Sequence, residues 1–391
     1  MRKPFRGNVA PEKLFMRTDR FNNNMLKVLH FYKTYYPDSY GGIEQVIFQL
    51  VESGLKKGIS ASVLSVSPHA GESTIAHHNA YKAKQDISFA SSPFSVSAIK
   101  QFAELSRQAD VIHFHFPWPY MDMVDLLTRV KKPKVVSYHS DIIRQKRLLP
   151  FYKPLMYRFL NGVDRIIATS PNYVETSEVL GRYKDKVNVI PIGLDEKTYP
   201  VPDGQKIAYW RSKISQPYFL FIGTLRYYKG LHILLDAIKD APYRVVIIGA
   251  GSIEQELKQQ AERLALTNIQ FLGALPDVDK VALLQDCYGI VFPSHLRSEA
   301  FGISLLEGAM CGKPLISSEI GTGTTYINID EHTGLVVPPS DPLALRRAMD
   351  RLWFEPLFAA ECGINARHRF KTLFTSDVMV DKYKEIYQQL A

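Results

Sequence analysis

The chain has 391 residues, a net charge of +9 and 46% hydrophobic residues. This length exceeds one ordinary hydrophobic core, so we expect two domains. No apolar run approaches the ~20 residues of a membrane-spanning helix, and no hydrophobic signal-peptide core stands near the start. The positive charge suits a phosphorylated substrate or an anionic membrane surface. No nucleic-acid motif accompanies the charge, so we expect no nucleic-acid partner.

The three cysteines, Cys287, Cys311 and Cys362, are widely spaced and fit no metal-binding pattern. Reduced thiols in the cytoplasm are therefore the expectation. Residues 1–24 are polar and basic without strand or helix periodicity, which predicts a disordered leader. Met25 directly precedes the first expected strand. We expect either that Met25 is the natural start or that the leader is dispensable.

Short apolar runs alternate with segments of helical spacing along the rest of the chain, which is typical of buried parallel strands connected by helices. The alternation occurs twice, on either side of a polar, proline-containing stretch at 196–217. We predict an α/β protein with two doubly wound, Rossmann-like domains, 25–195 and 218–373, which face a cleft and are joined by a linker. A last helix is expected in 374–391. The expected strands are 26–31, 62–66, 110–115, 134–138 and 164–169 in the first domain and 218–222, 244–248, 268–272, 288–292 and 314–317 in the second.

Residues 298–314 place two glutamates, Glu299 and Glu307, eight positions apart. A loop that ends at Gly302 leads into an apolar run with helical spacing from Ile303. The first amides of such a helix have no partner in the chain and carry partial positive charge, so they suit a diphosphate. A carboxylate beside them can accept hydrogen bonds from the hydroxyls of a sugar or a ribose. These groups together predict a site for a sugar nucleotide.

Glutamates that only compensate a helix dipole would explain an isolated pair. Here the flanking residues extend the pattern, with Phe-Pro-Ser at 292–294 and Gly-Lys-Pro at 312–314. The whole segment resembles the E-x7-E signature of the family 4 (group 1) glycosyltransferases, and the resemblance extends from Leu26 to the C-terminus. It implies the GT-B fold and a retaining hexosyltransferase that uses a nucleotide sugar. No Asp-x-Asp metal site is evident, and Arg and Lys can neutralise the phosphates, so we expect no metal and no other cofactor.

Two further strand-to-helix turns carry groups that suit phosphate. Gly41 and Gly42 follow the first strand, where glycines let a ligand approach the backbone and the amides of the next helix. This turn resembles the G-G-x-E loop of the same family. Simple turn chemistry would also explain the two glycines.

The second domain opens with a strand that ends at Gly223, and two cations, Arg226 and Lys229, follow it. Such cations can stabilise the charge that develops on a leaving nucleoside diphosphate, although a solvated basic loop is the simpler alternative. The family commonly has Gly-Arg-Leu here, whereas this chain has Thr224. The resemblance implies that Lys229 binds the donor phosphate, and Arg226 is expected to reach it from two residues later.

The resemblance also implies the remaining roles. Glu307 holds the ribose, and His139, at the end of an expected strand, contacts the donor sugar across the cleft. A lone histidine in such a place is otherwise structural. The groups expected to orient the donor sugar are Glu299 and the backbone of Phe301, Gly302 and Ile303, with Ile303 also at the phosphate.

Two histidines, His113 and His115, share one face of an expected strand, and no further zinc ligand is evident. We expect them near the acceptor mouth, with Trp118 and Tyr120 as a platform for a sugar. Residues 144–159 combine cations with apolar and aromatic side chains. This pattern suits either an interfacial segment on anionic lipid or an amphipathic core helix.

Within the family, three runs that begin at Lys33, Phe116 and Glu319 resemble mannosyl- and rhamnosyltransferases of bacterial O-antigen and lipopolysaccharide synthesis. This implies a GDP-linked donor, a polyprenyl-diphosphate-linked saccharide acceptor, and a cytoplasmic protein that is peripheral on the plasma membrane. Three alternatives stay open: a nucleotide-sugar epimerase, a phosphorylase of similar architecture, and a scaffold that binds sugar nucleotides without turnover. The scaffold stays open because Thr224 replaces the arginine that the family commonly has at this position.

Overall fold

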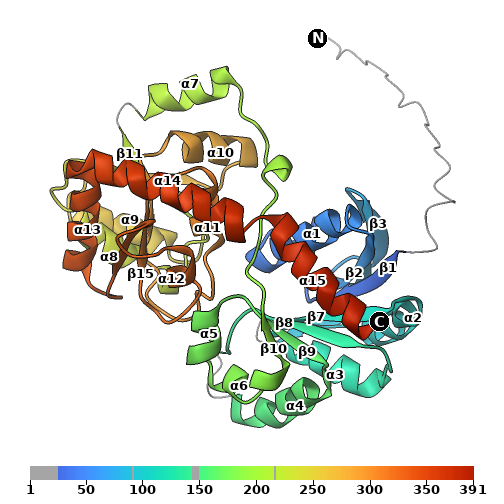
Figure 1. Cartoon of the computed structure of the whole chain (residues 1–391). Helices are drawn as coiled ribbons and strands as arrows, with labels where there is room; N and C mark the ends of the chain where they lie inside the picture. The colour runs from blue at the N-terminus through green and yellow to red at the C-terminus, as the bar shows by residue number, and fades with distance from the viewer. Residues whose placement is uncertain (1–24, 90–91, 143–148, 215–216) are drawn as a thin grey trace, which may run out of the picture.

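The computed structural model describes residues 25–89, 92–142, 149–214 and 217–391. The predicted leader and the first part of the basic, aromatic segment lie outside the described residues. Two α/β domains lie side by side, each built on a largely parallel sheet with helices packed against it (Figure 1). The predicted fold class is confirmed. Within the described part of the chain, no helix has both the length and the apolar character that a bilayer crossing requires.

The N-terminal sheet has the strand order β10 (Val187–Val189), β9 (Arg165–Ala168), β8 (Lys134–Tyr138), β7 (Val111–Phe116), β1 (Leu26–Phe31), β2 (Ile59–Ser67), β4 (His78–Lys84) and β3 (Gly71–Ile75). Neighbours are parallel except β3, which pairs antiparallel with β4. The strand order changes direction between β1 and β7, because β2 lies on one side of β1 and the later strands β7 to β10 lie on the other. The loops that follow these two strands therefore diverge and leave a crevice at their carboxyl ends.

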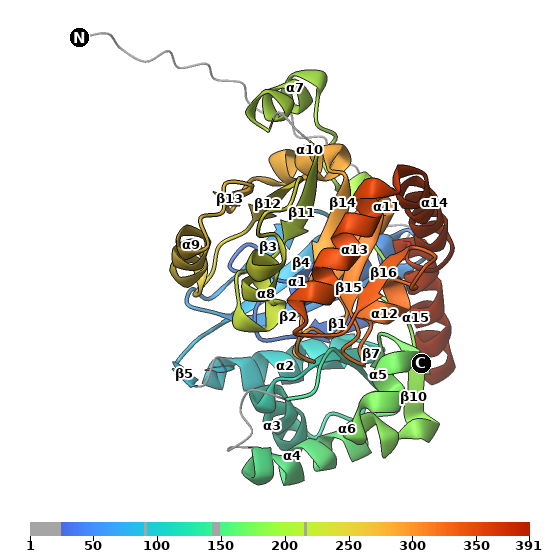
Figure 2. The same cartoon turned by 90° about the vertical axis from the view of Figure 1, so that its left-hand side faces the viewer.

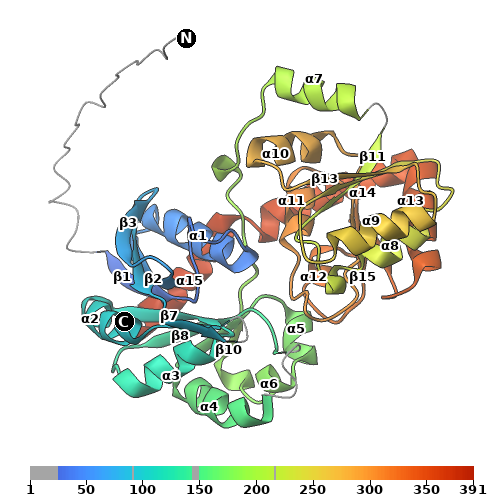
Figure 3. The same cartoon turned by 180° about the vertical axis from the view of Figure 1, so that it is seen from behind.

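Helices cover both faces of this sheet (Figures 1 and 3). Amphipathic α1 buries Val46, Ile47, Leu50 and Val51, four positions with the spacing of one helical face. Smaller elements complete the domain. The helices are α1 (Gly42–Leu55), α2 (Val96–Gln108), α3 (Pro119–Thr128), α4 (Leu149–Gly162), α5 (Pro171–Thr176), α6 (Glu178–Gly181) and η1 (Lys184–Lys186), and the two-stranded sheet is β5 (Ile87–Phe89) with β6 (Ser92–Phe94).

The C-terminal sheet is parallel throughout, in the order β13 (Ile269–Gly273), β12 (Arg244–Ile248), β11 (Tyr218–Ile222), β14 (Gly289–Phe292), β15 (Leu315–Ser318) and β16 (Gly334–Val337). Its strands are near-continuous apolar runs because both faces are covered (Figure 2). The order reverses between β11 and β14, so the loops after these strands flank the second crevice. The helices of this domain are η3 (Tyr227–Lys229), α8 (Leu231–Ala237), α9 (Glu254–Arg263), α10 (Asp277–Asp286), α11 (Ile303–Met310), α12 (Thr324–Ile327), α13 (Pro342–Phe354) and α14 (Pro356–Leu373).

The last helix, α15 (Ser376–Leu390), crosses from the C-terminal domain and packs against α1 (Figure 1). The start of α15 lies beside Leu194, where the chain first passes from the N-terminal to the C-terminal domain. The Leu194 amide donates to the Phe374 carbonyl over 2.9 Å, and the Ser376 amide donates to the Leu194 carbonyl over 3.0 Å. A side chain on Gly193 would overlap the carbonyl oxygen of Thr375, so glycine permits this close approach.

The expected strands correspond to observed ones, but the sequence analysis missed the hairpin β3–β4, the pair β5–β6, and the edge strands β10 and β16. Most of these segments are short or polar and lie at edges, where an apolar run is not required. The predicted linker also contains regular structure, with η2 (Glu196–Thr198) and α7 (Gly204–Lys213). No residue of α7 is fully buried, and polar contacts hold it on α10: Trp210 and Lys206 both donate to Asp279, each at 2.9 Å.

Candidate active site

The two crevices open onto one cleft of about 740 Å³ between the domains. Residues that follow β1 and β8 line it from one side, and residues that follow β11 and β14 line it from the other. The predicted site residues on its walls are Gly41, Gly42, His139, Gly223, Lys229, Glu299, Phe301, Gly302, Ile303 and Glu307. Arg226 instead lines a neighbouring cavity.

The start of α11 forms one wall of this cleft. Gly302 precedes the helix with a φ of 102°, a left-handed conformation that glycine adopts without strain, and no side chain caps the helix. The first amides therefore keep their donors for a ligand. Phe301 is buried behind them, and the Ser304 hydroxyl donates to the Ile222 carbonyl over 2.7 Å, which ties the helix start to β11.

The start of α1 faces α11 from the other domain. Gly41 precedes this helix, again without a side-chain cap. A Cβ on Gly42 would lie 3.2 Å from Cδ1 of Ile303, so the absence of a side chain allows the two helix starts to approach closely. The carboxylate of Glu44, in the first turn of α1, lies against Gly41 and accepts a hydrogen bond from the Thr34 hydroxyl over 2.7 Å. Two uncapped helix starts, each with the positive end of its dipole toward the same space, favour an anion between them.

Lys229 and Glu299 form an ion pair on the C-terminal wall, and only 11% of each side chain is exposed. Lys229 belongs to η3, directly after β11, and its ammonium also lies 4.7 Å from the ring centre of Phe292. The Ser294 hydroxyl donates to the same carboxylate over 3.4 Å. The two residues predicted to hold the phosphate and the sugar are therefore neighbours.

Glu307 lies on α11 and is 3% exposed. Its carboxylate accepts hydrogen bonds from the Lys280 ammonium and the Tyr199 hydroxyl, both over 3.1 Å. Burial alone lowers the pKa of Lys280, but the charges of Glu307 and Asp277 outweigh it and leave that pKa above its usual value. Lys280 is therefore a fixed cation beside the acid predicted to bind ribose.

Three further residues of this site, which the sequence did not predict, are Lys280, Tyr199 and Gln45. The Gln45 amide donates to the Tyr199 hydroxyl over 2.7 Å, so a polar chain runs from α1 through the interdomain segment to Glu307. Lys280 lies in the first turn of α10, directly after Pro276, and this position at a helix start was the only local sign of a binding role. Lysines in such turns are commonly exposed, so only the tertiary contact identifies it.

His139 follows β8 and lines the cleft, and its ring stacks on that of His115 with centroids 5.3 Å apart. Nε2 of His139 and Nδ1 of His115 lie 3.0 Å apart, and one of these nitrogens donates to the other. Burial lowers the pKa of His139 to about 3, so the ring is neutral near pH 7. A neutral ring held in this way has a defined orientation toward the cleft.

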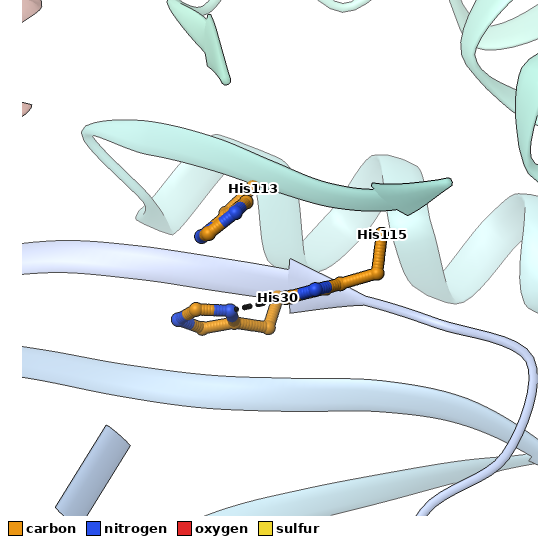
Figure 4. A group of neighbouring side chains, drawn as sticks. All are labelled: His30, His113 and His115. Carbon is orange, nitrogen blue, oxygen red and sulfur yellow. Dashed lines mark hydrogen bonds between the residues drawn. The ribbon is translucent and has the colours of Figure 1, made fainter. Parts of the chain in front are cut away.

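Behind His139, the rings of His30, His113 and His115 gather on one side of β1 and β7 (Figure 4). Their nearest nitrogens lie within 4.8 Å of one another, which would suit a shared cation. Hydrogen bonds already account for their positions, however. His113 contacts Tyr387 and Ser137 over 2.6 and 2.8 Å, and His115 contacts His30 over 3.0 Å as well as His139. Burial lowers the pKa of all three, to about 3 for His30.

The structure contradicts the prediction for three residues of the expected acceptor mouth, His113, His115 and Tyr120. His113 and His115 are completely buried. Helix α15 brings Tyr383 and Tyr387 onto His113 from the far end of the chain, and His115 packs among His30, Tyr32 and His139. Tyr120 is also buried and donates to the carbonyl of Ser95, so it offers no platform.

Trp118 packs against Phe31, with ring centres 4.9 Å apart, and lines the cavity next to the cleft. Helix α4 contains the described part of the basic, aromatic segment. Its Met156, Phe159 and Leu160 are buried, as in a core helix, whereas Phe151 is 86% exposed.

Known proteins of similar sequence are glycosyltransferases, which agrees with a site for a sugar nucleotide. The family described as Glycosyl transferases group 1 matches residues 206–369, and Glycosyltransferase Family 4 matches residues 40–198. The chain is 58% identical to D-rhamnosyltransferase WbpZ of Pseudomonas aeruginosa over 90% of this chain and 93% of that protein. It is 49% identical to O-antigen chain mannosyltransferase C of Escherichia coli over 93% of this chain and 99% of that protein.

Solved structures match in fold. Sucrose-phosphate synthase of Thermosynechococcus elongatus has a TM-score of 0.76 at 20% identity, with 93% of this chain and 99% of that chain covered. An Anabaena protein in complex with UDP and glucose has a TM-score of 0.75 at 18% identity, with 93% and 100% covered. The chain therefore belongs to the family 4 glycosyltransferases and has the GT-B fold. The predictions of the family, the fold and a hexosyltransferase activity are confirmed.

Proposed function

We propose that this glycosyltransferase transfers mannose or rhamnose, with retention of configuration, from a GDP-linked donor to a polyprenyl-diphosphate-linked saccharide in bacterial O-antigen synthesis. The observation that carries the proposal is the meeting of two uncapped helix starts, at Gly42 and Ile303, beside the cation Lys229. Backbone donors and a cation from both domains thereby surround a space that suits a diphosphate. The names of the two similar proteins, a rhamnosyltransferase and an O-antigen mannosyltransferase, support the choice of sugar and pathway.

Each residue then has a distinct task. Lys229 and the amides at the starts of α1 and α11 bind the diphosphate and stabilise its charge as it leaves. Glu299 and the α11 amides orient the sugar, and Glu307 accepts hydrogen bonds from the ribose hydroxyls. His139 contacts the sugar from the N-terminal domain. Closure of the two domains excludes water, which would otherwise compete with the acceptor.

The proposal requires no metal, because Lys229 and backbone donors can neutralise the diphosphate. It places the enzyme in the cytoplasm, on the inner face of the plasma membrane, where a lipid-linked acceptor is accessible. Exposed Phe151 on α4 and the positive net charge support contact with anionic lipid.

Thermal-shift measurements with GDP, UDP, ADP and their sugars test the donor. We expect GDP and GDP-mannose or a GDP-deoxyhexose to stabilise the protein most, since a ligand that binds only the folded state raises the unfolding temperature. Equal or larger shifts with UDP or ADP would contradict the guanosine assignment. A reaction with the best donor and a polyprenyl-diphosphate saccharide then tests transfer. Conversion of the donor without acceptor would indicate an epimerase, a requirement for free phosphate a phosphorylase, and binding without turnover a scaffold.

A further inference from the structure

A second cavity of about 1030 Å³ adjoins the donor cleft, and Ser140, Tyr228 and Ser298 line both. Like the cleft, it is formed by both domains, because it lies at the carboxyl ends of the same two sheets. It is the larger of the two spaces, and a ligand in it would be in direct reach of a sugar held in the cleft. An acceptor must lie beside the donor sugar, and this cavity meets that requirement.

Two cations face this second cavity from opposite domains. Lys33 follows β1, and Arg226 follows β11. Among the described residues, no salt bridge joins either side chain to a carboxylate. Burial, together with the charge of Arg226, lowers the pKa of the half-buried Lys33, while Glu44 opposes the shift. Asp141 also lines the cavity, but its carboxylate is paired with Arg297 over 3.4 Å. Two further cations that face one space therefore favour an anionic ligand.

The rest of the lining is mainly apolar and aromatic. Phe89, Phe94 and Tyr152 come from the N-terminal domain, and Tyr227 and Ile253 come from the C-terminal domain. Such walls suit the apolar face of a sugar or a hydrocarbon chain. The cavity therefore combines a site for an anion with apolar surface, which is the chemistry of a sugar joined to a lipid through a diphosphate.

Thr224 and Arg226 sharpen the assignment. Thr224 occupies the position where the family pattern has arginine, and it lines the donor cleft; Arg226 lines only the second cavity. We propose that Arg226 and Lys33 bind the diphosphate of a polyprenyl-diphosphate-linked acceptor, so that Arg226 serves acceptor recognition and Lys229 binds the diphosphate of the donor. This inference rests on the proposed transfer to a lipid-linked saccharide and replaces the expected donor role of Arg226.

The test measures binding of farnesyl diphosphate to the full-length protein by isothermal titration, with the donor cleft saturated by GDP. If another nucleotide stabilises the protein best, it takes the place of GDP. We expect Arg226→Ala and Lys33→Ala each to weaken farnesyl diphosphate binding about tenfold, as loss of one charge-assisted contact predicts. Affinity for the nucleotide should stay unchanged in both variants. Arg263→Ala, which removes an exposed arginine from α9 in the same domain, is the matched control and should bind as wild type does.

Farnesol, which lacks the anion, should bind weakly and equally to wild type and variants. The inference is overturned if farnesyl diphosphate does not bind the nucleotide-loaded protein, if Arg226→Ala binds it as wild type does, or if Arg226→Ala weakens nucleotide binding instead. Failure of the proposed function has a different signature, because it would appear in the wild type as absence of nucleotide binding or of transfer. Circular dichroism of each variant establishes that it is folded.

Discussion

The ammonium of Lys229 and the carboxylate of Glu299 neutralise each other inside the donor cleft, with 11% of each side chain exposed. The proposed function assigns them to different parts of the donor, the diphosphate and the sugar. Donor binding therefore replaces one internal ion pair with two contacts to the ligand. Since an unpaired buried charge is costly, the pair keeps both groups in the cleft until the donor enters.

Lys229→Ala should lower kcat by about 10²–10³-fold, because a preorganised donor for the leaving diphosphate is lost. Steady-state kinetics at saturating acceptor measures the effect. Lys229→Arg retains the charge and should keep part of the activity. Wild-type turnover by Lys229→Ala would exclude its role at the donor phosphate.

Glu299→Gln should separate nucleotide binding from transfer. The neutral amide releases Lys229 for the diphosphate, so we expect GDP to bind at least as tightly as it binds to the wild type. Turnover should nevertheless fall by about 10²-fold, because the sugar loses an oriented carboxylate. Titration with GDP and kinetics with the GDP sugar give the two readouts. Weaker GDP binding together with normal turnover would contradict the role of Glu299 at the donor sugar.

Gly42→Val should weaken nucleotide binding about tenfold, because its side chain would press on Ile303 and force the two helix starts apart. The double variant Gly42→Val/Ile303→Ala should recover part of the affinity, since it removes the atom that the new side chain meets. Gly71→Val, at a strand position with open space around it, is the control. Unchanged affinity in the single variant would show that the helix starts do not bind the diphosphate jointly.

Glu307→Ala should affect both ribose recognition and stability. Wild type should bind 2′-deoxy-GDP about tenfold more weakly than GDP, and the variant should discriminate less. The variant should also lose about 1–3 kcal/mol of unfolding free energy, because Lys280 and Tyr199 lose their buried acceptor. Urea unfolding measures this loss. Adding Lys280→Met should restore some stability, and full discrimination in Glu307→Ala would remove the ribose assignment.

Stability should decrease in acid because of the buried histidines. The pKa of His30 and His139 is about 3 in the folded protein, well below the usual 6.5, and the pKa of His113 and His115 is also lowered well below it. The unfolded chain therefore binds these protons first. The histidine contribution is complete above about pH 6.5 and falls as the pH drops toward 3, by about 1 kcal/mol per histidine per pH unit.

Urea unfolding between pH 5 and 7 measures this slope. The slope gives the number of protons taken up on unfolding. His113→Gln should lower this number by about one, whereas His69→Gln, at an exposed position, should leave it unchanged. A slope that is the same in wild type and His113→Gln would mean that His113 is not held neutral.

Much of the fold could be predicted because buried parallel strands must be apolar along their whole length. Runs such as Tyr218–Ile222 and Leu26–Phe31 satisfy this condition, and their alternation with helices leaves few alternatives to doubly wound sheets. Segments under weaker constraints escaped prediction. The β3–β4 hairpin is at an edge, and α7 has no fully buried residue and is held by polar contacts to Asp279 and by the partly buried Trp210.

The local sequence by itself determined the glycosyltransferase family and the groups that depend on backbone conformation. A turn at Gly302 and a helix start at Ile303 follow from the glycine and from the helical spacing of the apolar residues after it. Only the tertiary structure decided which distant side chains meet. It buried His113 beneath Tyr387, joined Lys280 to Glu307, and placed Arg226 in a different cavity from Lys229, three residues away. Such contacts depend on how two domains and a returning helix pack, and residue spacing carries no information about that packing.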